Sequence, residues 1–113
     1  MQEVSVIIPN FNGMAYLDGV LAGLECQSVN NFEVILVDNG SSDGSCAFVA
    51  ARYPWVHLIE LPENFGFCKA VNEGIKASRA PYVLLLNNDI EVTENFIEEM
   101  IFAIKRHPKA FSC

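Results

Sequence analysis

Short apolar runs alternate with helically spaced apolar residues along the whole chain. The apolar runs predict buried strands over Val4–Pro9, Phe32–Val37, Val56–Leu61 and Tyr82–Leu86. Helical spacing appears between and after them, at Leu17, Val20, Leu21 and Leu24; at Phe67, Ala70, Val71, Gly74 and Ile75; and at Phe96, Ile97, Met100, Ile101 and Ile104. A further helix is predicted from a Ser42 cap to Arg52. The predicted order is therefore β-α-β-α-β-α-β-α.

This alternation predicts an α/β fold with an open parallel sheet and helices on both faces. In such sheets, ligands bind beyond the carboxyl ends of the strands, where the strand order reverses. Polar turns occupy this position after every predicted strand: NFN, DNGSSD, ENFG and NND. We therefore expect these turns to converge on one edge of the sheet and to form the functional site.

Composition narrows the range of partners. The chain has 113 residues, of which 51% are hydrophobic, so it is one domain or part of one and can form a core. Seven Lys and Arg residues against fourteen Asp and Glu residues give a formal charge of −7, which argues against a nucleic-acid partner. An anionic ligand would need helix N-termini or a metal ion.

The cysteines and the ends of the chain suggest where the protein works. Cys26, Cys46, Cys68 and Cys113 are widely spaced and form no C-x-x-C pair, which favours reduced packing cysteines in a cytoplasmic protein. No apolar stretch is long enough for a membrane span, and no signal peptide is recognisable. Lys109–Cys113 reads as the start of another strand, so we expect residues 1–113 to be part of a longer domain.

Two carboxylates stand at predicted strand ends. Asp38 follows a buried strand, where it either builds a turn with its polar neighbours or accepts hydrogen bonds from a nucleobase or a ribose. Asp89 ends the triplet Asn87-Asn88-Asp89, where it either caps a turn or offers a hard oxygen ligand to Mg²⁺ or Mn²⁺. Because one carboxylate is a weak metal site, substrate phosphates would have to complete the shell.

The third turn opens a helix. The amides after Asn64-Phe65-Gly66-Phe67 can face a phosphate, and Lys69 in the first turn either adds charge or is solvated. The chain contains no G-x-G-x-x-G or Walker A sequence, so NAD and P-loop chemistry are poor interpretations. No Ser–His–Asp or Cys–His pairing can be argued from the spacing.

The four segments VSVIIPNFN, ILVDNGSSDGS, ENFGFCKAVNEGI and YVLLLNNDIEV together resemble the family-2 glycosyltransferases of the GT-A fold. Their order and spacing agree over nearly the whole chain. The NFGF and LLNND forms are similar to the branch with bacterial rhamnosyltransferases and polysaccharide enzymes. The resemblance implies a Rossmann-like N-terminal half of a GT-A domain.

The resemblance also implies roles for individual residues. Those implied to bind the nucleotide sugar are Pro9, Phe11, Asn12, Asp38, Asn64, Gly66, Phe67, Asn72, Asn87 and Asn88. Phe11 would pack near the base, Asp38 would accept its hydrogen bond, and Asp89 would bind Mg²⁺ or Mn²⁺. Asn87 replaces the first acid of the D-x-D motif.

The implied activity is inverting transfer of a sugar from a nucleoside diphosphate to a glycan or lipid-linked acceptor, with UDP or dTDP favoured over GDP. The general base would lie in a C-terminal part beyond residue 113, so we predict that this chain alone is inactive. Membrane contact, at the inner face, would come through the parent protein. A non-catalytic nucleotide-binding or regulatory module is the open alternative. A receiver domain is disfavoured, because the loops NFNG and ENFG lack its acids.

Overall fold

The computed structural model describes residues 3–88 and 92–106. Their order of elements is the predicted one, with bounds β1 Val4–Asn10, α1 Met14–Glu25, β2 Phe32–Asp38, α2 Ser45–Arg52, β3 His57–Glu60, α3 Phe67–Ala77, β4 Tyr82–Leu85 and α4 Phe96–Arg106. The α/β prediction is thus confirmed. The strand predicted over Val56–Leu61 is shorter by one residue at each end, and the predicted strand at Lys109–Cys113 lies outside the described residues.

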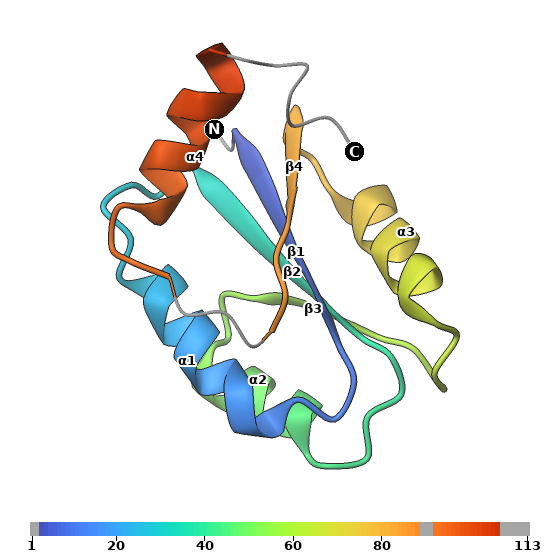
Figure 1. Ribbon diagram of the computed structural model, residues 1–113. Coiled ribbons are helices and arrows are strands. Elements are labelled where there is room, and N and C mark those ends of the chain that lie inside the picture. The colour runs from blue at the N-terminus through green and yellow to red at the C-terminus, as the bar shows by residue number, and fades with distance from the viewer. Residues whose placement is uncertain (1–2, 89–91, 107–113) are drawn as a thin grey trace.

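The strands form one parallel sheet in the order β3-β2-β1-β4. The chain moves outward from β1 to β2 and β3, and then returns to place β4 on the other side of β1 (Figure 1). The strand order therefore reverses between β1 and β4. Register places Asn10, the last residue of β1, beside Asp38, the last residue of β2.

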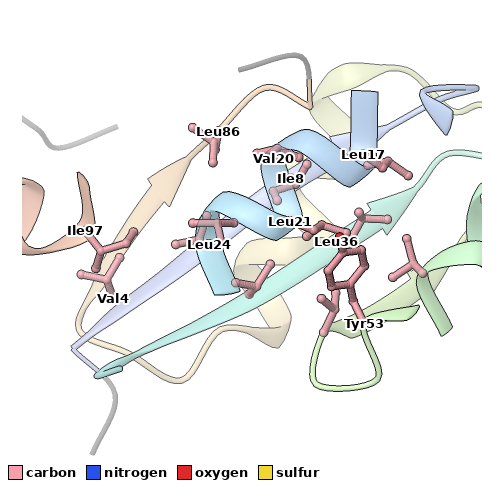
Figure 2. Close-up of a cluster of buried hydrophobic side chains, with 14 of the residues drawn as sticks. Val4, Ile8, Leu17, Val20, Leu21, Leu24, Leu36, Tyr53, Leu86 and Ile97 are labelled. Carbon is pink, nitrogen blue, oxygen red and sulfur yellow. The ribbon is translucent and has the colours of Figure 1, made fainter. Parts of the chain in front are cut away.

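Helices cover both faces of the sheet, and each face has its own apolar cluster (Figure 1). Alternate residues of β1, such as Val4 and Ile8, meet Leu21 of α1 and Ile97 of α4 (Figure 2). The intervening residue Ile7 joins Ile35, Val37 and Ala70 of α3 on the opposite face. Burial of both faces explains why the strands read as nearly continuous apolar runs.

The start of α2 differs from the prediction. The Ser42 cap is wrong, because α2 begins only at Ser45, after Gly44 with its left-handed φ of 86°. The neighbouring Asp43 instead accepts hydrogen bonds from the first residues of both α1 and α2. Its Oδ1 accepts the Ser45 amide at 3.0 Å, and its Oδ2 accepts the Met14 amide at 3.0 Å. A carboxylate at two positive helix ends is favourable, and the hydrogen bond from Ser45 lowers the pKa of Asp43.

No helix within residues 3–88 and 92–106 is both long enough and apolar enough to cross a membrane.

Candidate functional site

A cavity of about 380 Å³ opens at the carboxyl ends of the strands. It brings together residues from the turns after β1, β2, β3 and β4, which are far apart in sequence. Those predicted as site residues are Pro9, Phe11, Asn64, Phe67, Asn87 and Asn88. Sequence reasoning did not assign two further lining residues, Asn10 and Asn39, to the site. The described lining contains five asparagines and no charged side chain.

A chain of side-chain hydrogen bonds crosses the edge of the sheet beneath this cavity. Asn88 Nδ2 donates to Asn10 Oδ1 at 2.7 Å, and Asn10 Nδ2 donates to Asp38 Oδ1 at 2.9 Å. Ser41 closes the chain by donating to Asp38 twice, from its hydroxyl at 2.6 Å and from its amide at 2.8 Å. The contacts join β4, β1 and β2 at the point where the strand order reverses.

Asp38 is buried, with 2% of its surface exposed. Burial on its own would raise the pKa of the Asp38 carboxyl, but the hydrogen bonds from Ser41 and Asn10 outweigh burial and lower that pKa. The carboxyl is therefore ionised near neutral pH. It forms the turn with its polar neighbours, which was one of the two predicted interpretations, and it lies beneath the cavity instead of lining it.

Glycine at position 13 makes room for the amide chain. A Cβ atom there would lie 2.1 Å from Asn88 Nδ2 and 2.3 Å from Asn10 Oδ1. Any other residue would force these two side chains apart. Gly13 has a φ of −97°, so the requirement is for space and not for an unusual backbone conformation.

Asn39 fixes the turn that precedes α3. Its Oδ1 accepts the Phe65 amide at 3.0 Å, and its Nδ2 donates to the Gly66 carbonyl at 3.0 Å. Asn64 Oδ1 accepts the Gly66 amide at 2.8 Å within the same turn. Gly66 has a φ of 94°, which L residues rarely adopt, and it sets the direction in which α3 leaves the turn.

The N-terminus of α3 points to the same edge. Its first amides, those of Phe67, Cys68 and Lys69, donate to no other residue in the part of the chain that the structure describes. Phe67 also lines the cavity. Unpaired amides and the helix dipole together favour an anion there. The Lys69 ammonium pairs with Glu73 at 3.1 Å on the exposed side of α3.

Besides Asp38, three predicted site residues do not line the cavity. Asn12 is exposed and fixes the neighbouring turn, because its backbone amide donates to Ser41 Oγ at 2.8 Å. Gly66 is exposed in the turn that Asn39 fixes. Asn72 is exposed one turn further along α3. Asp89, the predicted metal ligand, lies outside the described residues.

Among residues 3–88 and 92–106, no group of three or more His, Cys, Asp or Glu side chains is placed to hold a metal ion. Burial, reinforced by the nearby Asp38, raises the pKa of the Cys46 thiol to about 12, so Cys46 is no nucleophile. Cys26 and Cys68 are free, as predicted, but exposed instead of packed.

A second cavity, of about 410 Å³, lies near the opposite end of β2. Leu24, Val29, Phe32 and Val34 line it with Trp55, and none of these was predicted as a site residue. The Trp55 ring nitrogen donates to Glu25 Oε2 at 3.0 Å, so this polar group is already paired. The two cavities have nearly equal volumes, so volume does not distinguish them. The cavity at the carboxyl ends differs in its lining, where side-chain amides from several turns converge. Amide oxygens and nitrogens can accept from and donate to the hydroxyl groups of a ligand.

Comparison with known proteins gives consistent results. Residues 5–113 match the model described as Glycosyl transferase family 2. The Streptococcus pneumoniae protein named Glycosyltransferase GlyG is 31% identical over 100 residues, which cover 86% of this chain and 33% of GlyG. The chain thus spans about a third of the length of this relative.

Two solved structures share the fold. A crystal structure of S. aureus TarS 1-349 in complex with UDP-GlcNAc aligns with a TM-score of 0.84 and 26% identity, covering 95% of this chain and 32% of that one. The mannosyltransferase PcManGT from Pyrobaculum calidifontis, in complex with GDP-Man and Mn²⁺, aligns with a TM-score of 0.73 and 26% identity, covering 79% of this chain and 28% of that one.

Proposed function

The chain belongs to glycosyl transferase family 2, and from this premise we propose that it forms the donor-binding half of a glycosyltransferase. The whole protein would move a sugar from a nucleoside diphosphate to a hydroxyl group of a glycan or lipid-linked acceptor, with inversion. The observation that carries the proposal is the amide-lined cavity of about 380 Å³ where the strand order reverses. The named ligands of TarS and PcManGT, UDP-GlcNAc and GDP-Man, support a nucleotide sugar as the ligand.

The base is assigned to the end of the cavity nearest β2. Phe11 lies at the cavity, and with 49% of its surface exposed it offers a ring face to a base. Asp38 Oδ1 already accepts from Asn10 and Ser41. We therefore assign the contact with a base N–H to Asp38 Oδ2, which accepts the Ser41 backbone amide. Because Asp38 lies beneath the cavity, this contact requires the turn of Ser41 to open towards the base. UDP and dTDP are the favoured nucleotides.

The diphosphate and sugar are assigned to the other turns. The free amides at the start of α3 face the phosphates, and Asn64, Asn87 and Asn88 bind hydroxyl groups. Gly66 shapes the phosphate turn, and Asn72 is assigned to the sugar end of the donor.

Asp89 is the proposed ligand of Mg²⁺ or Mn²⁺. The described neighbours Asn87 and Asn88 carry amide oxygens, and with a carboxylate and substrate phosphates they make a hard donor set that suits either ion. A bound ion would supply charge neutralisation of the diphosphate leaving group. The Mn²⁺ named in the PcManGT complex supports this assignment.

Thermal unfolding with UDP, dTDP and GDP, each with and without Mn²⁺, tests the proposal on the protein at its full natural length. A ligand present at 100 times its Kd should raise the free energy of unfolding by about 2.7 kcal/mol. We expect a metal-dependent shift for one nucleotide, and Asp89→Ala should abolish its metal-dependent part. Glu94→Ala, which removes an equal charge from an exposed position, should keep the shift. The absence of any nucleotide shift in the unaltered protein would contradict the proposal.

A further inference from the structure

Asn10 is a buried polar residue for which the proposed function has no role. Only 2% of its surface is exposed, and both ends of its amide are hydrogen-bonded. It lies between the residue assigned to the base, Asp38, and the turn assigned to the hydroxyl groups and the metal. Asp38 and Asn88 share no hydrogen bond with each other, so Asn10 is the side chain that connects them.

The orientation of each amide follows from the chemistry of Asp38. An ionised carboxylate can only accept hydrogen bonds, so the Asn10 nitrogen must point towards it. The Asn10 oxygen then points the other way, where it can only accept. The Asn88 nitrogen must therefore face Asn10. No hydrogen bond from another described residue occupies the Asn88 oxygen, so it can face the cavity that Asn88 lines.

We propose that Asn10 is a positioning residue that passes the polarity of the Asp38 carboxylate to Asn88, so that Asn88 presents its amide oxygen to a hydroxyl group of the bound nucleotide sugar. The ligand in this statement rests on the proposed function. The relay of orientation does not, because it is a property of the protein alone. Gly13 makes the relay possible, since a Cβ there would lie 2.3 Å from Asn10 Oδ1.

The relay predicts that one substitution rescues another across two hydrogen bonds. Asn88→Asp should be harmful, because its carboxylate would face the Asn10 oxygen and two acceptors would meet. Adding Asp38→Asn should relieve the conflict. The side-chain oxygen of the new amide at position 38 can accept from the Ser41 backbone amide, and its nitrogen can donate to the Asn10 oxygen. The Asn10 side chain can then rotate, so that its nitrogen donates to the carboxylate at position 88.

The experiment is an unfolding cycle on the protein at its full natural length without ligand. We expect Asn88→Asp to lower the folding equilibrium constant about tenfold or more, and the double variant with Asp38→Asn to be more stable than Asn88→Asp alone. Introducing Asn10→Leu, which has a similar shape and no amide, should abolish this rescue. If the fold-decreases in the folding equilibrium constant of the two single variants simply multiply in the double variant, the proposal is overturned.

Asn87→Asp is the matched control, because it adds the same charge one residue earlier, at an exposed position whose side chain shares no hydrogen bond with Asn10 or Asp38. Its cost should be the same with Asp or Asn at position 38. Equal rescue of Asn87→Asp would point to a general effect of charge and would overturn the relay.

Binding of UDP, dTDP and GDP with Mn²⁺ supplies the second readout. For the nucleotide that binds, Asn10→Leu should raise Kd about tenfold, and the rescue pair should not regain affinity, because its Asn10 amide is reversed. If the unaltered protein binds none of them, the proposed function fails while the unfolding cycle still tests the relay. If it binds and Asn10→Leu leaves Kd unchanged, the assignment of Asn88 to the ligand fails.

Discussion

The two ends of the β1–β2 pair use the same device for different purposes. At each end a carboxylate of β2 accepts a hydrogen bond from its register partner on β1: Glu33 from Ser5, and Asp38 from Asn10. The two pairs lie on opposite faces of the sheet, because Ser5 and Asn10 are an odd number of residues apart. The Ser5–Glu33 pair stabilises the fold, and the Asn10–Asp38 pair also orients a side chain that lines the cavity.

The difference lies in where the hydrogen bonds lead. Around Glu33 they end in backbone, because Glu33 accepts the Arg79 amide at 2.8 Å and Ser5 accepts the Ala80 amide at 3.3 Å. Around Asp38 they continue through the Asn10 side chain to Asn88 and the cavity. A polar cluster that ends in backbone can only hold a strand in place, whereas one that ends in a side chain can adjust what a ligand meets.

Removing each carboxylate gives the largest expected contrast. Asp38→Ala leaves the buried donors of Asn10 and Ser41 without an acceptor, so we expect it to lower the free energy of unfolding by about 3 kcal/mol. It should also raise the nucleotide Kd at least about tenfold. Glu33→Ala should cost about 1–2 kcal/mol and leave the nucleotide Kd unchanged. Urea unfolding and nucleotide titration measure both; a change in Kd for Glu33→Ala would break the comparison.

Low pH should reduce the stabilisation that the Asp38 carboxylate provides. Because the pKa of Asp38 is lowered in the folded protein, its ionisation contributes stability above the unfolded pKa of 3.8, and this is lost as pH falls through the folded pKa. The difference in melting temperature between the unaltered protein and Asp38→Asn should therefore be constant near neutral pH and shrink below about pH 4. Asp43, whose pKa is also lowered, is present in both variants and cancels. A difference that does not depend on pH would contradict the assignment.

The smallest effect is expected in the cavity near the opposite end of β2. Trp55→Phe loses a hydrogen bond to Glu25 at an exposed position, but it keeps an aromatic ring beside Tyr53. We expect the free energy of unfolding to change by no more than about 0.5 kcal/mol and the nucleotide Kd to stay the same. Phe11→Leu, at the amide-lined cavity, is the matched variant and should raise Kd at similar stability. Equal effects on Kd would mean that the two cavities do not differ in function.

The sequence predicted the sheet well because the relevant signal is local. Strand and helix periods can be read within a window of about 11–18 residues, and the four polar turns follow directly from the ends of the apolar runs. Parallel topology then places those turns at one edge by geometry alone. For this reason the turns that contain Phe11, Asn64 and Asn88 could be placed at one edge from the sequence, whereas the roles of the individual residues came from the resemblance to a family.

The parts that were missed depend on contacts between distant residues. Asn10 reads as an ordinary turn residue, and only its contacts with Asp38, 28 residues away, and with Asn88, 78 residues away, show its place in the site. A local pattern also could not show that Gly44 would delay α2 to Ser45, since Ser42 is a good cap in isolation.

The uncharged lining of the cavity has a kinetic consequence. The described lining residues carry no formal charge, whereas the chain as a whole carries −7 at pH 7. A nucleotide anion therefore meets repulsion while it approaches and none from those residues once it has arrived. Salt screens charges that are separated by more than about 8 Å at physiological ionic strength. For the nucleotide binding proposed above, added salt should thus speed association with this chain and leave dissociation nearly unchanged, so that the nucleotide binds more tightly as ionic strength rises, the reverse of a basic site.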